Sequence, residues 1–152
     1  MSRAAKIVFA VFVAGFLLLI GLVAVGWWWW SKHGDELLES GKQTIAEGRK
    51  EGAKLKEPQC LDMALQKYHR DRDDIVAAIK NHLWLKSCLE TSQVQEDFCR
   101  NIPGADQALE SAFWAIAKCD DLQASDDYCR KIFQEVQKYC ISPQRAKKRR
   151  DE

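Results

Sequence analysis

The distribution of apolar and polar positions divides the chain into two parts. Residues 7–30 form an unbroken run without a charged side chain, and every charged residue except Arg3 and Lys6 follows that run. As a helix, this run would extend roughly 36 Å at about 1.5 Å per residue, and the hydrocarbon core of a bilayer is roughly 30 Å thick. The pattern therefore predicts a transmembrane helix over residues 7–30, after a short N-terminal segment over residues 1–6.

The flanking residues predict the orientation of this helix. Arg3 and Lys6 precede the run, whereas Lys32 is soon followed by Asp35 and Glu36. Cationic residues near a span tend to stay on the cytoplasmic side, so we expect residues 1–6 in the cytoplasm and the rest of the chain in the periplasm or outside the cell. Indole rings favour the headgroup level of a membrane. Four consecutive tryptophans therefore predict a collar at the outer boundary: Trp27, Trp28, Trp29 and Trp30.

A cleaved secretory signal is the alternative interpretation of the same run. Ala24, Val25 and Gly26 place small residues just ahead of Trp27, at a spacing suited to signal peptidase. The apolar stretch before that point is longer than the roughly 7 to 15 residues of an ordinary signal peptide. The alternative, in which the mature protein begins at Trp27, stays open at this point.

An internal repeat with a period of 30 residues organises the polar part. Sliding the chain against itself by this distance aligns six positions in register: Trp84 with Trp114, Asp97 with Asp127, Phe98 with Tyr128, Cys99 with Cys129, Arg100 with Arg130 and Ile102 with Ile132. A third, degenerate copy begins near Cys60 and has His69 where the other two have their second cysteine. The repeat predicts a series of similar helical hairpins.

Apolar residues at helical spacing predict the helices of each hairpin. In the central copy they are Ile75, Val76, Ile79, Leu83 and Leu89, and in the last helix they are Tyr128, Ile132, Phe133, Val136 and Tyr139. Ser92 with Gln95, and Ser125 with Asp126, are typical of residues that begin a helix. We therefore expect an all-α domain over residues 58–142, with about five short helices.

All six cysteines lie in this part of the chain: Cys60, Cys88, Cys99, Cys119, Cys129 and Cys140. An even number confined to a small domain outside a membrane indicates disulfides. Zinc sites usually bring two ligands within two to four residues, and no pair here is so close. If each hairpin carries its own disulfide, Cys88 pairs with Cys99 and Cys119 with Cys129. Cys60 and Cys140 would then close the domain.

The segment over residues 31–57 predicts a charged helical stalk between anchor and domain. One stripe of this helix falls on the apolar positions of a heptad: Leu38, Gly41, Ile45, Gly48, Gly52 and Leu55. Glycine in an exposed helix costs about 1 kcal/mol relative to alanine. The stripe is therefore either part of a loosely helical, solvated stalk or a surface that packs closely against a partner helix or this protein's own domain.

The C-terminal segment over residues 143–152 lacks large apolar residues, which predicts a disordered basic tail. Its basic residues are Arg145, Lys147, Lys148, Arg149 and Arg150. Residues 31–144, in contrast, carry more acidic than basic residues. The tail is either a solubilising terminus or a tether to anionic lipid headgroups or to an acidic partner.

The sequence offers little support for catalysis or for a cofactor. His69 and Asp73 share one helix face, but pairs of this kind are common on helix surfaces, and His82 lies in an amphipathic helix. Phosphate-binding glycine loops and common nucleophile or zinc-protease motifs are missing. Arg100 and Arg130 are expected to pair with nearby acidic side chains. We therefore expect no catalytic residues, no metal, no cofactor and no nucleic-acid partner, and we identify no small-molecule substrate.

Helical hairpins that repeat every 30 residues and carry disulfides resemble, in architecture, the cysteine-rich alpha/alpha repeat proteins of bacterial envelopes. The resemblance covers residues 60–140 and transfers no functional residue. The sequence favours an interaction protein that is anchored in membrane lipid. Such an accessory or scaffolding subunit would dock on another membrane or envelope protein. The alternative is a secreted or tethered ligand-binding or inhibitor-like module.

Overall fold

The computed structural model describes residues 3–124 and 126–151, without the side chains of residues 3–11, 29, 30, 33, 34 and 37. Its helices are α1 (Arg3–Gly52), α2 (Glu57–Arg70), α3 (Ile75–Thr91), α4 (Ala108–Asp121), α5 (Asp127–Cys140) and α6 (Pro143–Asp151). Within these described residues, the only extended pairing is an isolated bridge between Lys56 and Gln93. The prediction of an all-α fold is confirmed.

The chain consists of two compact units, Met1–Ser40 and Gly41–Glu152. The boundary between these units falls inside the predicted stalk, so residues 41–57 belong to the second unit. In the first unit, the large apolar side chains of α1 that are described are exposed, among them Phe16, Leu18 and Leu22. No helix in the part of the chain that the structure describes is long and apolar enough to cross a membrane. The side chains of Trp29 and Trp30 lie outside the described residues.

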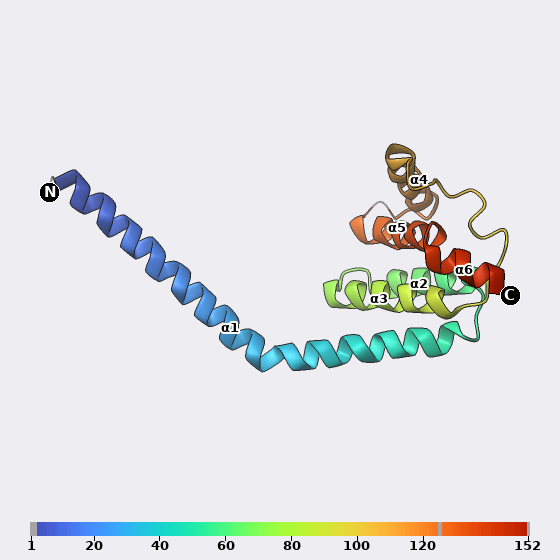
Figure 1. The fold of residues 1–152 in the computed structure, drawn as a ribbon, viewed down its shortest axis with the longest axis horizontal. Coiled ribbons are helices and arrows are strands. Elements are labelled where there is room, and N and C mark those ends of the chain that lie inside the picture. The colour runs from blue at the N-terminus through green and yellow to red at the C-terminus, as the bar shows by residue number, and fades with distance from the viewer. Residues whose placement is uncertain (1–2, 125, 152) are drawn as a thin grey trace. The chain divides into compact units, whose positions relative to one another are not determined.

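The core of the second unit forms where α3 packs against α2 and α5, while α4 packs on α5 (Figure 1). Trp84, Leu85 and Leu89 of α3 are fully buried. The face of α5 that was expected to point inward does so, with Ile132, Phe133, Val136 and Tyr139 buried and Tyr128 packed against them. Asp126 accepts a hydrogen bond from the backbone N–H of Cys129 and begins α5, as predicted.

Three disulfides link these helices: Cys60–Cys88, Cys99–Cys140 and Cys119–Cys129. The Cys119–Cys129 pairing is confirmed, whereas Cys88–Cys99 and Cys60–Cys140 were wrong. The two bonds that join neighbouring helices, α2 to α3 and α4 to α5, obey one geometric rule. Each pair lies equally far before and after the turn, at Asp74 in one hairpin and at Ala124 in the other. Antiparallel helices bring such positions to the same level.

The segment over residues 92–107 explains why the other two pairings failed. It contains turns and no helix in place of the expected second helix of the central repeat. Ser92 ends α3 instead of starting a helix, because its backbone N–H donates to the carbonyl of Cys88 and its hydroxyl to that of Leu89. Phe98 and Ile102 of the segment pack against the core. The segment is held by the disulfide to Cys140 and by a hydrogen bond from the Gln137 side chain to the carbonyl of Pro103. The two aligned copies are therefore not equivalent hairpins.

The end of α1 contacts α3 through two glycines. A β-carbon placed on Gly48 would lie 2.6 Å from the carbonyl oxygen of Trp84, and one on Gly52 would lie 2.8 Å from the α-carbon of Cys88. Polar contacts flank this interface, because Thr91 donates to the carbonyl of Arg49 at 3.0 Å and the Trp84 indole donates to Glu51 at 3.0 Å.

Part of the predicted stripe thus packs closely against the protein's own domain. Ile45 and Leu55 are half-buried, whereas Leu38 is exposed and Gly41 has open space around its α-carbon. The solvated-stalk interpretation is wrong for residues 48–52, and the glycines there are explained by the close approach of two helix backbones.

We expect replacement of Gly52 by alanine to lower the free energy of unfolding by about 1–3 kcal/mol, because the added methyl group has no room against α3. Gly41→Ala is the matched control. It adds the same methyl group to the same helix where nothing lies within 4 Å, so it should leave stability unchanged or raise it by up to about 1 kcal/mol. Denaturant unfolding of the full chain in detergent, followed by near-ultraviolet circular dichroism, measures both. Equal effects of the two substitutions would contradict the packing described here.

Candidate functional site

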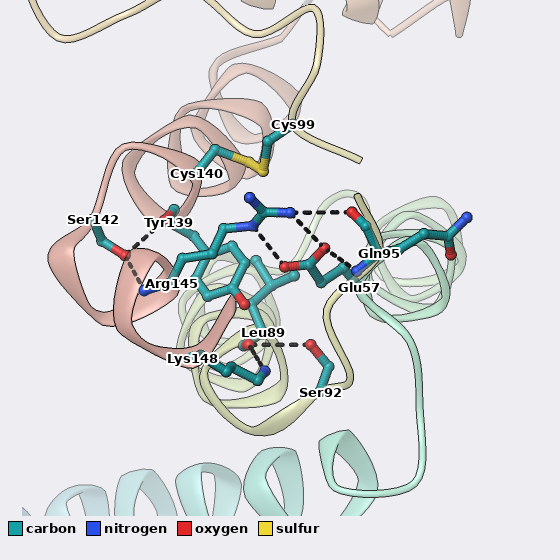
Figure 2. Close-up of polar contacts among 10 residues, drawn as sticks. All are labelled: Glu57, Leu89, Ser92, Gln95, Cys99, Tyr139, Cys140, Ser142, Arg145 and Lys148. Atoms are coloured by element: carbon teal, nitrogen blue, oxygen red, sulfur yellow. Dashed lines mark hydrogen bonds and ion pairs between the residues drawn. A yellow bond between two sulfur atoms is a disulfide. The ribbon is translucent and has the colours of Figure 1, made fainter. Parts of the chain in front are cut away.

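Three segments that are distant in sequence meet at a buried ion pair between Glu57 and Arg145 (Figure 2). Glu57 begins α2 and is 0% exposed, and Arg145 lies in α6 and is 5% exposed. Nε of Arg145 donates to Glu57 at 2.7 Å, and Nη2 donates at 3.0 Å. Gln95 completes the arrangement, because its backbone N–H donates to Glu57 at 2.9 Å and its carbonyl accepts from Arg145 at 3.1 Å. Several hydrogen bonds therefore compensate for the removal of both charges from water.

This ion pair corrects the prediction of a disordered tail. Residues 143–151 form α6, which Arg145 holds against the domain, and Lys148 donates to the carbonyl of Leu89 at 3.4 Å.

Burial and the charge of Glu57 also raise the pKa of the nearby Tyr139 hydroxyl, which stays protonated at neutral pH. Lys147, Arg149 and Arg150 of the predicted anionic-surface tail are exposed. The cluster of Glu57, Gln95 and Arg145 joins the start of the domain to its end. The two charged side chains bind each other, so neither is free to bind a ligand.

A concave surface suited to a ligand lies elsewhere, between the C-terminal end of α2, α3 and α5. It is a groove of about 390 Å³, within the range of roughly 300–1,000 Å³ typical of ligand pockets. Its lining is mostly apolar and includes Tyr68, Ala77, Ala78, Ile79, Leu83, Tyr128 and Ile132. We call this surface the α3 groove.

Basic side chains surround the α3 groove. Its lining includes four cationic residues, Lys67, Arg72, Lys131 and Lys138, and a single acidic one, Asp71. The Asp71 carboxylate is paired with Arg70 at 3.2 Å. Two of the four cations are already paired, Arg72 with Asp126 and Lys138 with Glu135, so the positive charge that the rim offers a ligand comes mainly from Lys67 and Lys131. This charge around an apolar floor favours a ligand with an apolar body and acidic edges.

The cations of the rim are positioned by groups close to the core. The Lys67 ammonium lies 3.5 Å from the centre of the Trp84 ring, and burial lowers its pKa. Arg72 is paired with Asp126 at 3.2 Å, and Tyr68 donates to the same carboxylate. Burial and the Asp126 charge raise the pKa of Tyr68 to about 12. Burial disfavours the charged form of Asp126, but its hydrogen bonds outweigh this effect and lower its pKa.

Two polar residues of α3, Asn81 and His82, line the groove. Asn81 is 8% exposed, and its amide nitrogen donates to the carbonyl of Ala64 at 2.8 Å, while its side-chain oxygen has no partner among the described residues. Nε2 of His82 lies 3.2 Å from Glu135. This interaction, with support from Lys138 and Lys86, lowers the pKa of Glu135 despite its burial. His82 thus packs at the rim next to a buried carboxylate.

An exposed apolar stripe continues the groove along α3. Ile75, Val76 and Ile79, whose spacing predicted the helix, are exposed, Ile75 by 62%. The buried face of α3 is formed by Trp84, Leu85, Cys88 and Leu89. Sequence reasoning missed this surface because the spacing was used to locate the helix and not to ask which of its apolar residues stay uncovered. The available signal was that apolar residues occur all around this helix.

The other candidate residues are dispersed. No three His, Cys, Asp or Glu side chains among the described residues lie close enough together to hold a metal ion. Arg100 and Arg130 pair with Asp97 and Asp127, as predicted, although the first pair lies in a turn and the second in a helix. The α3 groove is therefore the site that the geometry favours.

Comparison with known proteins leaves the function to be argued from this geometry. No protein-family model matches the chain, and no curated protein or solved structure matches it.

We expect Arg145→Met to lower the free energy of unfolding by about 3–5 kcal/mol, because it leaves the buried Glu57 carboxylate without a counter-ion. Arg149→Met is the matched control, since Arg149 is an exposed residue of the same helix, and it should change stability by less than about 0.5 kcal/mol. Denaturant unfolding of the full chain measures both. A loss of equal size in the two variants would contradict the role assigned to the buried pair.

Proposed function

We propose that this chain is a membrane-tethered accessory or scaffolding subunit whose helical domain docks on a larger membrane or envelope complex through the α3 groove. In this proposal residues 7–30 lie in lipid, residues 1–6 lie in the cytoplasm, and the domain lies on the opposite side. The observation that carries the proposal is a concave apolar surface with a basic rim, continued by exposed isoleucines, on a rigid support.

The three disulfides support the proposed compartment. All six cysteines are paired, and four of them are 0–1% exposed. Structural disulfides persist in oxidising spaces such as the periplasm or the exterior of the cell and are rare in the cytosol. The uncharged run over residues 7–30 supports a tether that delivers the domain to such a space.

The shape and charge of the α3 groove favour an amphipathic helix as its occupant. Ile75, Ile79 and Leu83 are spaced four residues apart, so they form a ridge along α3 that can pack against the side chains of another helix. Helices commonly dock into such grooves through an apolar face. The excess of cations on the rim favours acidic residues beside that face. We therefore assign the groove to an acidic amphipathic helix of a protein partner.

A tether strengthens docking of this kind. Confinement to one membrane raises the effective concentration of neighbouring partners without adding a contact. A groove of modest area then suffices for a stable accessory role.

One observation favours the alternative of a small-ligand module, released by cleavage before Trp27. Asn81 is buried and lines the groove, and its side-chain oxygen lacks a donor. A small molecule with a donor group would satisfy this oxygen. The exposed Ile75 and Val76 lie outside the lining of the pocket, and a small ligand would leave them uncovered, so the helix is preferred.

We expect the tether to keep the chain in the membrane pellet after alkaline carbonate extraction, with an N-terminus ahead of residue 7. Arginine at the centre of a span costs about 2.5–3.5 kcal/mol, so Leu18→Arg combined with Leu22→Arg should release the chain. Leu38→Arg, outside the run, is the matched control and should remain in the pellet. A soluble wild-type protein that begins at Trp27 would contradict the tether and favour the released module.

We expect the α3 groove to bind a fluorescent, helix-constrained peptide with leucines at positions i, i+4 and i+7 flanked by glutamates. Fluorescence anisotropy with the full chain in detergent measures the affinity. Ile79→Glu should weaken binding at least tenfold, because it places a like charge in the apolar floor. Leu38→Glu, an equally drastic change of an exposed apolar residue outside the groove, should not. A peptide with lysines in place of the glutamates is the charge control, and its equal binding would contradict the proposed recognition.

A further inference from the structure

We propose that the helix received by the α3 groove is α4 of a second copy of this chain, so that copies associate head to tail. The inference rests on the proposed function of the groove and names its partner.

The first observation is an unpartnered apolar face on α4. Leu109, Phe113 and Ile116 follow one another at intervals of four and three residues, and Leu109 and Phe113 are 77% and 69% exposed. The opposite face of α4 already packs on α5 through Ala115 and Cys119. The fold of a single copy therefore gives no reason for this second apolar face. Contiguous exposed apolar surface of this kind typically marks an interaction site.

The second observation is charge complementarity between the two surfaces. The charged residues of α4 and the turn before it are mostly acidic, and all are exposed: Asp106, Glu110, Lys118, Asp120 and Asp121. The lining of the α3 groove has the opposite balance, with four cations and the single acid Asp71. Arg72 and Lys138 are paired with Asp126 and Glu135 beside the groove, so Lys67 and Lys131 supply most of the charge that acidic residues of α4 would meet. The acids next to the groove are partly engaged, since Asp74 caps the first turn of α3. An apolar ridge with acidic edges thus matches an apolar groove with a basic rim.

The contact must form between copies, because α4 is held away from the groove of its own chain. No residue of α4 belongs to the lining of the groove, and the disulfide Cys119–Cys129 ties the end of α4 to the start of α5. Each copy therefore presents one groove and one acidic helix. Contacts between two different surfaces form rings where the rotation closes and open rows where it does not. Tethering in a shared membrane would favour either assembly by raising the local concentration.

Two variants that each remove one surface test the inference by complementation. The groove variant combines Ile79→Glu with Lys131→Glu, and the face variant is Phe113→Glu, all at exposed positions. In detergent, size-exclusion chromatography with multi-angle light scattering should find wild-type protein in species larger than a dimer that dissociate at high salt. Each variant alone should be monomeric, and an equimolar mixture should give a dimer with one copy of each and nothing larger. Both variants keep residues 7–30, so any association through that segment is common to all samples.

A charge exchange provides the second measurement. Lys131→Glu alone should weaken assembly about tenfold, and adding Glu110→Lys to the same chain should restore it, because the opposite charges are then exchanged across the contact. A carbodiimide crosslink between Lys131 of an unlabelled copy and an acidic residue of α4 in a ¹⁵N-labelled copy would support the assigned contact. Wild-type protein that stays monomeric, a variant that still assembles, or a mixture without the mixed dimer would each overturn the inference.

The peptide titration described above separates the two levels of the proposal. If the acidic peptide binds the groove but wild-type copies do not associate, the groove takes a helix of another protein and only the present inference fails. If neither binding nor association is found, the proposed function fails as well.

Discussion

The structure depends on the enclosure of α3. This helix has apolar residues around its whole circumference, so contacts with other elements are what stabilise it most. α2 and α5 cover its buried face, and the glycines at the end of α1 allow a third backbone to reach Trp84 and Cys88. The N-terminal half of the helix stays uncovered, with Ile75 and Ile79 exposed. The apolar residues around α3 therefore form part of the core at its C-terminal half, and at its N-terminal half they form the surface to which we assign the function.

Parts of the fold that follow from local chemistry could be predicted from the sequence. The apolar spacing of α5 and the capping carboxylate of Asp126 specify a helix and its buried face without reference to other segments. The pairing of Cys119 with Cys129 follows because the turn between their helices is short. The 30-residue repeat, in contrast, was misleading. It preserves a local ion pair, Asp97–Arg100 and Asp127–Arg130, but only the second copy is helical. An aligned local motif does not guarantee equivalent tertiary structure.

Features that depend on distant partners could not be predicted from local patterns. Arg145 lies in a segment without large apolar residues, and its partner Glu57 is 88 positions away. Nothing near either residue indicates that both are buried. The α3 groove escaped prediction for a related reason, since the periodicity shows which residues are apolar but not which neighbours will be available to cover them. The glycine stripe was more informative. Three glycines on one helix face indicate either a solvated helix or close packing against another helix. At Gly48 and Gly52 the structure shows close packing, and the partner is α3.

The buried ion pair and the disulfides both stabilise a domain that is small, and each acts on different helices. A core of this size supplies little net stability, and disulfides add to it by limiting the freedom of the unfolded chain. Cys60–Cys88 fixes α3 on α2, and Cys99–Cys140 fixes the segment over residues 92–107 to the end of α5. The Glu57–Arg145 pair then orients α6, which no disulfide reaches, and its directional hydrogen bonds favour one position of that helix. Rigid support of this kind lets the domain leave apolar residues of α3 and α4 in water without rearranging to bury them. A binding surface that is formed in advance loses less conformational entropy when its partner arrives.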